Sequence, residues 1–297
     1  MRFVTFRAGS GAPAAGVLLG EQVADLSHPS CRGLLGDTAP SVLALVEQGL
    51  QRWTDRLSTW AFDAGALRPL SSVQLLAPLR PGKIVGAASN FTDALAERNM
   101  PPPTEPVVFV RSGCTVIGPG DAILVPPDVG NVGYEAELAV VIGRRALAVS
   151  REQAMRHVAG YTAHNDVSGS HLVKTDGGNF VRGKNLPASA PLGPWLATPD
   201  EVPDPYNVRI RLDIDGRPLQ DGSTATMLFR IAELISYVSH RMPLEPGDVI
   251  ATGTPAGVAA MHQPPAWLVP GATVTVNVEG FGPLVNPVRQ GEAFLER

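Results

Sequence analysis

Two glutamates stand two positions apart in the segment GYEAELAVVIG, at Glu135 and Glu137. Residues i and i+2 of a β-strand point to the same face, and the run that follows is continuously apolar, so both carboxyl groups are expected beside a buried strand. Desolvated carboxylates repel each other unless one holds a proton or a cation lies between them. A hard divalent cation satisfies both groups. The competing interpretation is a solvent-facing edge strand with two ordinary glutamates.

A third carboxylate follows another strand-like stretch. Asp166, in the segment GYTAHNDVSGS, is placed where it can supply a further oxygen ligand. Three carboxylates suit Mg²⁺ or Mn²⁺, with water or substrate oxygens completing the coordination shell. Without the two glutamates, Asp166 would be interpreted as an ordinary turn or capping residue.

The elements that position these residues indicate an α+β, β-rich protein. Residues 1–75 are expected to form a small N-terminal domain, with strands at 3–6 and near 16–19 and a helix in SVLALVEQGLQRW, where apolar residues recur at helical spacing. The proline-rich segment LLAPLRPGK forms the boundary to residues 80–297, which are rich in valine and turn signals. Three helices are predicted there: in DALAER, after Ser150, and after Thr226.

The composition excludes several classes of protein. Lys+Arg 24 against Asp+Glu 28 gives a net charge of −4, which argues against nucleic acid as a partner. Cys31 and Cys114 lack metal-finger spacing, and we expect neither a leader peptide nor a membrane span, so the prediction is a soluble cytoplasmic protein. A charged fraction of only 18% favours burial of surface in an oligomer.

Five segments in order extend the pattern: GYEAELAVVIG, YTAHNDVSGS, RGKNLPASAPLGPW, LEPGDVIATGTPAGV and VNVEGFGPLVNPV. Together they resemble the fumarylacetoacetate hydrolase family, including bacterial members with a small N-terminal domain, such as 2-hydroxyhepta-2,4-diene-1,7-dioate isomerases and acylpyruvases. The resemblance implies a mixed β-sheet roll preceded by a small α/β domain, and a homodimer. It also assigns the metal to Glu135, Glu137 and Asp166, in agreement with the chemistry of the residues.

The resemblance assigns further roles. Lys184 corresponds to the family's lysine, whose ammonium would stabilise a developing enolate. Gln220 and Thr254 match family positions near the substrate. In TGTPAGV, Gly253 lets the backbone approach a ligand and Thr254 offers a hydroxyl, which suits a carboxylate or a 2-oxo acid, although a plain hairpin turn is the alternative.

Two departures from the family concern catalysis. Hydrolytic members carry Asn-Tyr-x-x-His-x-x-Glu, whose histidine and glutamate activate water; here the segment is NFTDALAE, with Glu97 retained and Ala94 in place of the histidine. The family's Ser-Ala-Arg-Asp becomes Ser168, Gly169, Ser170 and His171, which removes the arginine that clamps a substrate carboxylate. Arg111 or Arg182 is then expected to bind that carboxylate, with His171 or His164 as candidate base.

The leading hypothesis is a metal-dependent enzyme for a small 2-oxo or diketo acid, cleaving a carbon–carbon bond of an acylpyruvate- or fumarylacetoacetate-like substrate through an enolate. Isomerisation (tautomerisation), decarboxylation or hydration from the same enolate is the close alternative, because only hydrolysis needs an activated water. A non-catalytic protein that binds the metal and a ligand is the rival from a different class.

Overall fold

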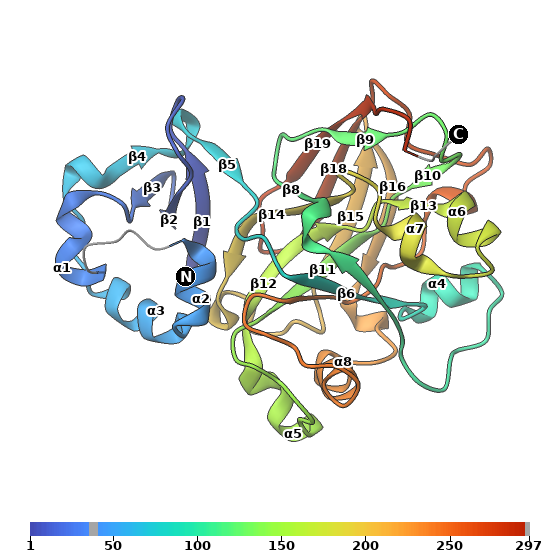
Figure 1. Ribbon diagram of the computed structural model, residues 1–297, viewed down its shortest axis with the longest axis horizontal. Coiled ribbons are helices and arrows are strands. Elements are labelled where there is room, and N and C mark those ends of the chain that lie inside the picture. The colour runs from blue at the N-terminus through green and yellow to red at the C-terminus, as the bar shows by residue number, and fades with distance from the viewer. Residues whose placement is uncertain (36–40, 295–297) are drawn as a thin grey trace.

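The computed structural model describes residues 1–35 and 41–294. Within them the strands form one large mixed sheet, a five-stranded sheet and a two-stranded ribbon (Figure 1). The large sheet has the order β4 (Leu67–Pro69), β3 (Gln22–Asp25), β2 (Ala14–Leu19), β1 (Arg2–Arg7), β14 (Ala190–Ala197), β12 (Val158–Asn165), β11 (Ala136–Ile142), β17 (Val249–Ala251), β6 (Lys83–Ala88) and β7 (Val107–Ser112), with β5 (Gln74–Leu76) on β1 and β8 (Val116–Ile117) on β14.

The five-stranded sheet has the order β16 (Arg217–Ser223), β15 (Arg209–Ile214), β18 (Thr273–Val278), β19 (Leu284–Gln290) and β9 (Ile123–Val125), and the ribbon pairs β10 (Val132–Gly133) with β13 (Ser168–Gly169). Most pairings are antiparallel, but β17 runs parallel to β6, β8 to β14 and β9 to β19. The predicted β-rich α+β class is confirmed.

Short helices lie around these sheets: α1 (Arg32–Leu35), α2 (Val42–Glu47), α3 (Leu50–Ser58), α4 (Thr92–Glu97), α5 (Arg151–Ala154), α6 (Ser170–Thr175), α7 (Phe180–Lys184) and α8 (Ile231–Ser239). The helix predicted from residue 42 onward is interrupted, because Gly49 has a φ of 95° that ends α2 and opens α3. The helix predicted after Thr226 begins later, at Ile231, where the Glu233 carboxylate accepts the Arg230 N–H at 2.9 Å.

Strand β11 is the centre of the molecule. All seven of its residues are buried, because its two faces meet different hydrophobic clusters. Leu138 and Val140 belong to the cluster that includes the five-stranded sheet and α8, whereas Ala139 and Val141 belong to the cluster that includes the N-terminal helices. The continuous apolar run in the sequence is therefore explained by burial on both faces.

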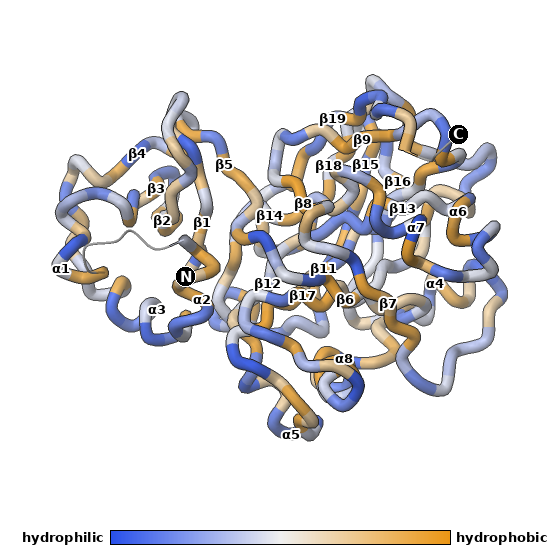
Figure 2. The backbone as a smooth tube through the Cα atoms, in the orientation of Figure 1, coloured by the Kyte–Doolittle hydropathy of each residue, from blue (hydrophilic) through white to orange (hydrophobic). Residues whose placement is uncertain are grey.

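Strands β1 to β4 near the N-terminus, with the helices α2 and α3, form a unit that extends the large sheet beyond β14 (Figure 1). Strand β1 pairs with the end of β14 through Arg2 opposite Ala197 and Phe3 opposite Leu196. Helices α2 and α3 cover this unit, and α3 buries only Leu50, Trp53 and Leu57. The rest of α3 is hydrophilic, as Figure 2 shows. The predicted boundary between residues 75 and 80 stays a prediction, because the sheet crosses it.

Leu45 tests the contribution of the N-terminal core. It lies on α2 and is fully buried, so Leu45→Ala is expected to lower the free energy of unfolding by about 2–5 kcal/mol. The matched control is Leu19→Ala on β2, where the side chain is 43% exposed and the expected change is below about 1 kcal/mol. Urea unfolding followed by tryptophan fluorescence measures both. Equal effects would show that the core of this unit contributes little.

Candidate metal centre and active site

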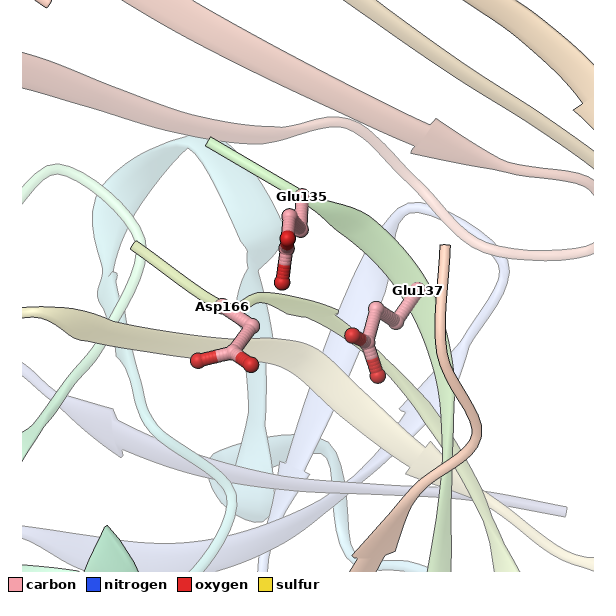
Figure 3. A group of neighbouring side chains, drawn as sticks. All are labelled: Glu135, Glu137 and Asp166. Atoms are coloured by element: carbon pink, nitrogen blue, oxygen red, sulfur yellow. The ribbon is translucent and has the colours of Figure 1, made fainter. Parts of the chain in front are cut away.

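Three carboxyl groups converge where two central strands come together. Glu137 lies in β11, Glu135 directly precedes that strand, and Asp166 directly follows β12. Because β11 and β12 are antiparallel neighbours, the start of one meets the end of the other, and the Asp166 N–H donates to the Glu135 carbonyl at 2.8 Å. One carboxylate oxygen from each residue lies within 4.8 Å of the others. Figure 3 shows the three side chains turned toward a common point.

Burial makes this cluster electrostatically demanding. Glu137 and Asp166 are almost fully buried, while Glu135 is half-buried. Burial raises the pKa of the Glu137 carboxyl well above its usual range, and the negative charges of Asp166 and Glu135 raise it further. An all-oxygen set of three acidic groups suits a hard divalent cation, which would keep all three ionised.

Two cations already hold Asp166. The Lys184 ammonium, from α7, lies 2.6 Å from an oxygen of Asp166 and 2.6 Å from an oxygen of Glu135. The fully buried Arg111 of β7 donates to the other oxygen of Asp166 and to the Ser189 carbonyl and hydroxyl. Burial alone would raise the pKa of Asp166, but Lys184 and Arg111 lower it to about 2, so this carboxylate is ionised throughout the physiological range.

The turn after β17 closes the other side. The Gly253 N–H donates to Glu137 at 3.0 Å, and this glycine has a φ of 95° with the Ala87 carbonyl 2.8 Å from the position of a Cβ. A larger residue there would be strained and would collide with backbone. Thr254 donates from its hydroxyl to the Ala136 carbonyl at 2.9 Å.

Gln220 links the turn at Thr254 to the backbone of β11 at Ala136. Its amide group donates to the Thr254 hydroxyl at 2.8 Å and accepts the Ala136 N–H at 3.0 Å. Ala136 stands between the two glutamates, so Gln220 positions the backbone that carries them. The structure therefore gives this buried residue a positioning role instead of a place on the cavity wall.

A cavity of about 220 Å³ opens above the triad. Lys184, Gly253 and Thr254 line it together with the three carboxylates. Phe109 and Phe180, stacked with centroids 4.7 Å apart, form an apolar wall, and the Lys184 ammonium lies 4.9 Å from the Phe109 ring centroid. The cavity thus has polar groups at its base and aromatic rings on one side, a combination common in small-molecule sites.

Helix α4 borders this cavity, and the residue that faces it is Ala94, which stands where the family's hydrolytic members have a histidine. Ala94 lines the cavity, whereas the Glu97 carboxylate accepts the Gly257 N–H at 3.0 Å and is not part of the lining. Asp93 accepts the Ala256 N–H and the Thr226 hydroxyl in the same region. Both acidic side chains of α4 therefore tie the helix to the loop after β17, and Glu97 does not face the triad as a water-activating group would.

Three other residues that the sequence suggested lie elsewhere. Arg182 is exposed and pairs with Asp176, away from the cavity lining. His171 is exposed on α6 and packs against Gly130. His164 is fully buried, donates from Nδ1 to the Pro191 carbonyl at 2.8 Å, and has its pKa lowered to about 4 by burial. Neither histidine lines the cavity.

Arg98 is the residue that sequence reasoning missed. It directly follows α4 and lines the cavity one helical turn beyond Ala94. The i, i+4 spacing from the missing histidine was a usable signal, because such residues share a helix face. Arg111 is engaged by Asp166 instead, so the structure does not place it where a substrate carboxylate would bind.

Comparison with known proteins decides the family. Residues 83–289 match the family model described as Fumarylacetoacetate (FAA) hydrolase C-terminal, which covers more than half of the chain. The chain belongs to the fumarylacetoacetate hydrolase family. Relatives in this family act in different ways, so membership establishes an enzyme family without fixing the reaction.

Three relatives illustrate that range. The mitochondrial oxaloacetate tautomerase FAHD2A of Homo sapiens is 40% identical over 222 residues, which is 74% of this chain and 71% of the relative. The 2-hydroxyhepta-2,4-diene-1,7-dioate isomerase of Mycobacterium marinum has a TM-score of 0.75 at 30% identity, covering 98% of both chains. The maleylpyruvate hydrolase of Sphingobium sp. SYK-6, solved with manganese(II) and pyruvate, has a TM-score of 0.77 at 27% identity over 98% of this chain and 100% of that one.

Among the helices that the structure describes in residues 1–35 and 41–294, none is long and apolar enough to cross a membrane.

The raised pKa of Glu137 predicts how metal affinity depends on pH. Below that pKa the carboxyl group must lose a proton before it can coordinate, so Mn²⁺ affinity is expected to rise with pH until Glu137 is ionised, with protons released on binding. Calorimetric titration in two buffers of different ionisation enthalpy measures both quantities.

Glu135→Ala is expected to abolish this binding, while Glu152→Ala, an exposed glutamate on α5, serves as control. Mn²⁺ binding that survives in Glu135→Ala, or that is insensitive to pH, would contradict the assignment.

Proposed function

We propose that this protein is a divalent-metal-dependent enzyme that interconverts the keto and enol forms of a 2-oxo acid. One combination of residues carries the proposal. The acidic triad and Lys184 are complete, but the residue of α4 that lines the cavity is Ala94, where a water-activating histidine would stand. A cation held by Glu135, Glu137 and Asp166 would polarise the oxygens of the 2-oxo acid group.

The protein's own residues supply the rest of the chemistry. The Lys184 ammonium, held by Glu135 and Asp166, places a positive charge and a proton beside the oxygen on which enolate charge develops. The Gly253 N–H keeps Glu137 in place, and the Phe109 and Phe180 rings shield one side of the cavity from water. Exclusion of water strengthens the attraction between the ammonium and the enolate.

Tautomerisation suits this set of groups better than hydrolysis. The enol loses its hydroxyl proton and gains a proton at carbon 3, and no water molecule enters the product. Hydrolysis requires a water oxygen to bond to a carbonyl carbon, and therefore a base beside that water. Among the described residues that line the cavity there is no histidine, and Glu97 is occupied by the Gly257 N–H.

Carbon–carbon hydrolysis of an acylpyruvate- or fumarylacetoacetate-like diketo acid is the second candidate. The structural likeness to a maleylpyruvate hydrolase favours it, as does the retention of Glu97 in its family register. Both reactions pass through an enolate, but hydrolysis forms it by breaking a carbon–carbon bond after an activated water has added to the carbonyl carbon, whereas tautomerisation forms it by loss of a proton. The 40% identity to an oxaloacetate tautomerase supports tautomerisation, the first candidate.

Product analysis by NMR separates the candidates. Oxaloacetate, acetylpyruvate and fumarylpyruvate are each incubated with protein and Mn²⁺ or Mg²⁺, with chelator, and with metal alone to correct for uncatalysed reaction. Metal-dependent enol–keto exchange without cleavage is expected. Pyruvate released together with a carboxylic acid would replace the proposal by hydrolysis, decarboxylation alone would assign the enolate to that reaction, and no conversion would identify a binding protein.

Lys184→Met is expected to lower the exchange rate by about 10²–10³-fold, because it removes the charge beside the enolate oxygen. Lys174→Met, an exposed lysine on α6, is the matched control and should retain the wild-type rate. A Lys184→Met enzyme with undiminished turnover would remove this residue from the proposed mechanism.

Ala94→His tests whether the water-activating pair can be restored. With histidine at 94 and Glu97 one turn away, hydrolysis of acetylpyruvate is expected to rise by on the order of tenfold or more. Ala96→His on the exposed side of α4 is the control. If pyruvate release is equal in both variants, the face of α4 at position 94 does not reach the reacting carbonyl.

A further inference from the structure

Arg98 has no protein partner for its charge. Among the described residues, its guanidinium takes part in no hydrogen bond or ion pair, and its Nε is buried without an acceptor. A buried donor without an acceptor is costly unless water or a ligand completes it, and the rest of this partly exposed side chain is free to meet a ligand. The two arginines that the sequence suggested for a substrate carboxylate are already paired with aspartates: Arg111 with Asp166, and Arg182 with Asp176.

Arg98 stands between two adjoining cavities. The first contains the triad, and the second, of about 260 Å³, extends away from it toward Trp267 and Met261. Both are lined by Arg98, Glu135, Ser168 and Ser170. A ligand that sits on the triad can therefore present its other end to Arg98.

Two substitutions make room for this arginine. Ser170 replaces the arginine expected in its motif, so the wall that it shares with Arg98 carries only a short side chain. Side chains on a helix lean toward its N-terminus, so Arg98 extends over the turn that contains Ala94, where a histidine would compete for the same space. The small residues Ala94 and Ser170 thus both leave space for the Arg98 side chain, which directly follows α4.

The charges around the cavities also favour an anionic ligand at Arg98. A divalent cation together with Lys184 and Arg111 more than balances the three carboxylates of the triad, so the triad leaves no negative charge to pair with the Arg98 guanidinium that lines the cavities. Guanidinium groups bind carboxylates by paired, charge-assisted hydrogen bonds.

We propose that Arg98 binds a second carboxylate of the substrate and that the enzyme is selective for 2-oxo dicarboxylic acids. This proposal rests on the proposed function for the position of the 2-oxo acid group, which lies at the triad and Lys184. The distal carboxylate lies at Arg98, near the boundary of the two cavities. Arg98 is a specificity-determining residue and does not take part in the proton transfer.

Binding of two unreactive ligands tests the proposal. Oxalate resembles only the 2-oxo acid end, whereas N-oxalylglycine resembles a 2-oxo dicarboxylic acid with its distal carboxylate. In calorimetric titrations of the Mn²⁺-loaded protein, Arg98→Met is expected to weaken N-oxalylglycine by on the order of 10- to 100-fold and to leave oxalate within about twofold. Arg98→Lys should recover part of the loss, and Arg289→Met, an exposed arginine on β19, should change neither.

Kinetics give a second readout. For oxaloacetate, Arg98→Met is expected to raise KM by a similar factor with little change in kcat, while the KM for phenylpyruvate, a monocarboxylic 2-oxo acid, stays nearly constant.

The outcomes separate this proposal from the proposed function. N-oxalylglycine affinity that is unchanged in Arg98→Met, with oxalate binding intact, overturns the role of Arg98. Wild-type protein that binds N-oxalylglycine through Arg98 but converts no substrate overturns the proposed function and supports the carboxylate site. Loss of oxalate binding in both Arg98→Met and Arg98→Lys, or failure of the wild type to bind either ligand, overturns the two-ended site itself.

Discussion

Repulsion among three closely spaced carboxylates, two of them buried, is the constraint around which the molecule is organised. Glu135, Glu137 and Asp166 lie too close together, and too far from bulk water, to be ionised without compensating charge. Lys184 and Arg111 provide part of that charge from two different elements, and both must be buried to do so. Buried ion clusters of this kind add little net stability, so the presence of one here points to function more than to folding.

The fold meets this constraint by bringing together the ends of central strands. The start of β11 and the end of β12 adjoin because the strands are antiparallel, and the turn after β17 reaches the same point because β17 is the other neighbour of β11. Gln220 then joins the turn at Thr254 to the backbone at Ala136. The positions of the carboxylates therefore depend on strand pairing within the most buried part of the sheet, where alternative registers would expose apolar residues.

The triad was predictable from the sequence because the patterns that indicate its residues lie within short segments of the chain. A period of two places Glu135 and Glu137 on one face, and the polar residue after a strand locates Asp166. The roles of the arginines were not predictable, because they depend on contacts between distant segments: Arg111 finds its partner 55 positions along the chain, and Arg98 reaches the cavity only because α4 is tied to the loop after β17. Gly49 shows the limit for helices, since apolar spacing alone continued α2 through a residue whose φ ends it.

The pairing of β1 with β14 has a consequence for the handling of this protein. Ala197 of β14 pairs with Tyr161 of β12 on one side and with Arg2 of β1 on the other, and the neighbouring Leu196 pairs with Phe3 of β1. Removal of that unit would leave backbone donors and acceptors of β14 unpaired beside the buried, apolar Leu196. An exposed edge of this kind is a template for pairing with another chain, so the small unit at the N-terminus also protects the catalytic sheet from aggregation.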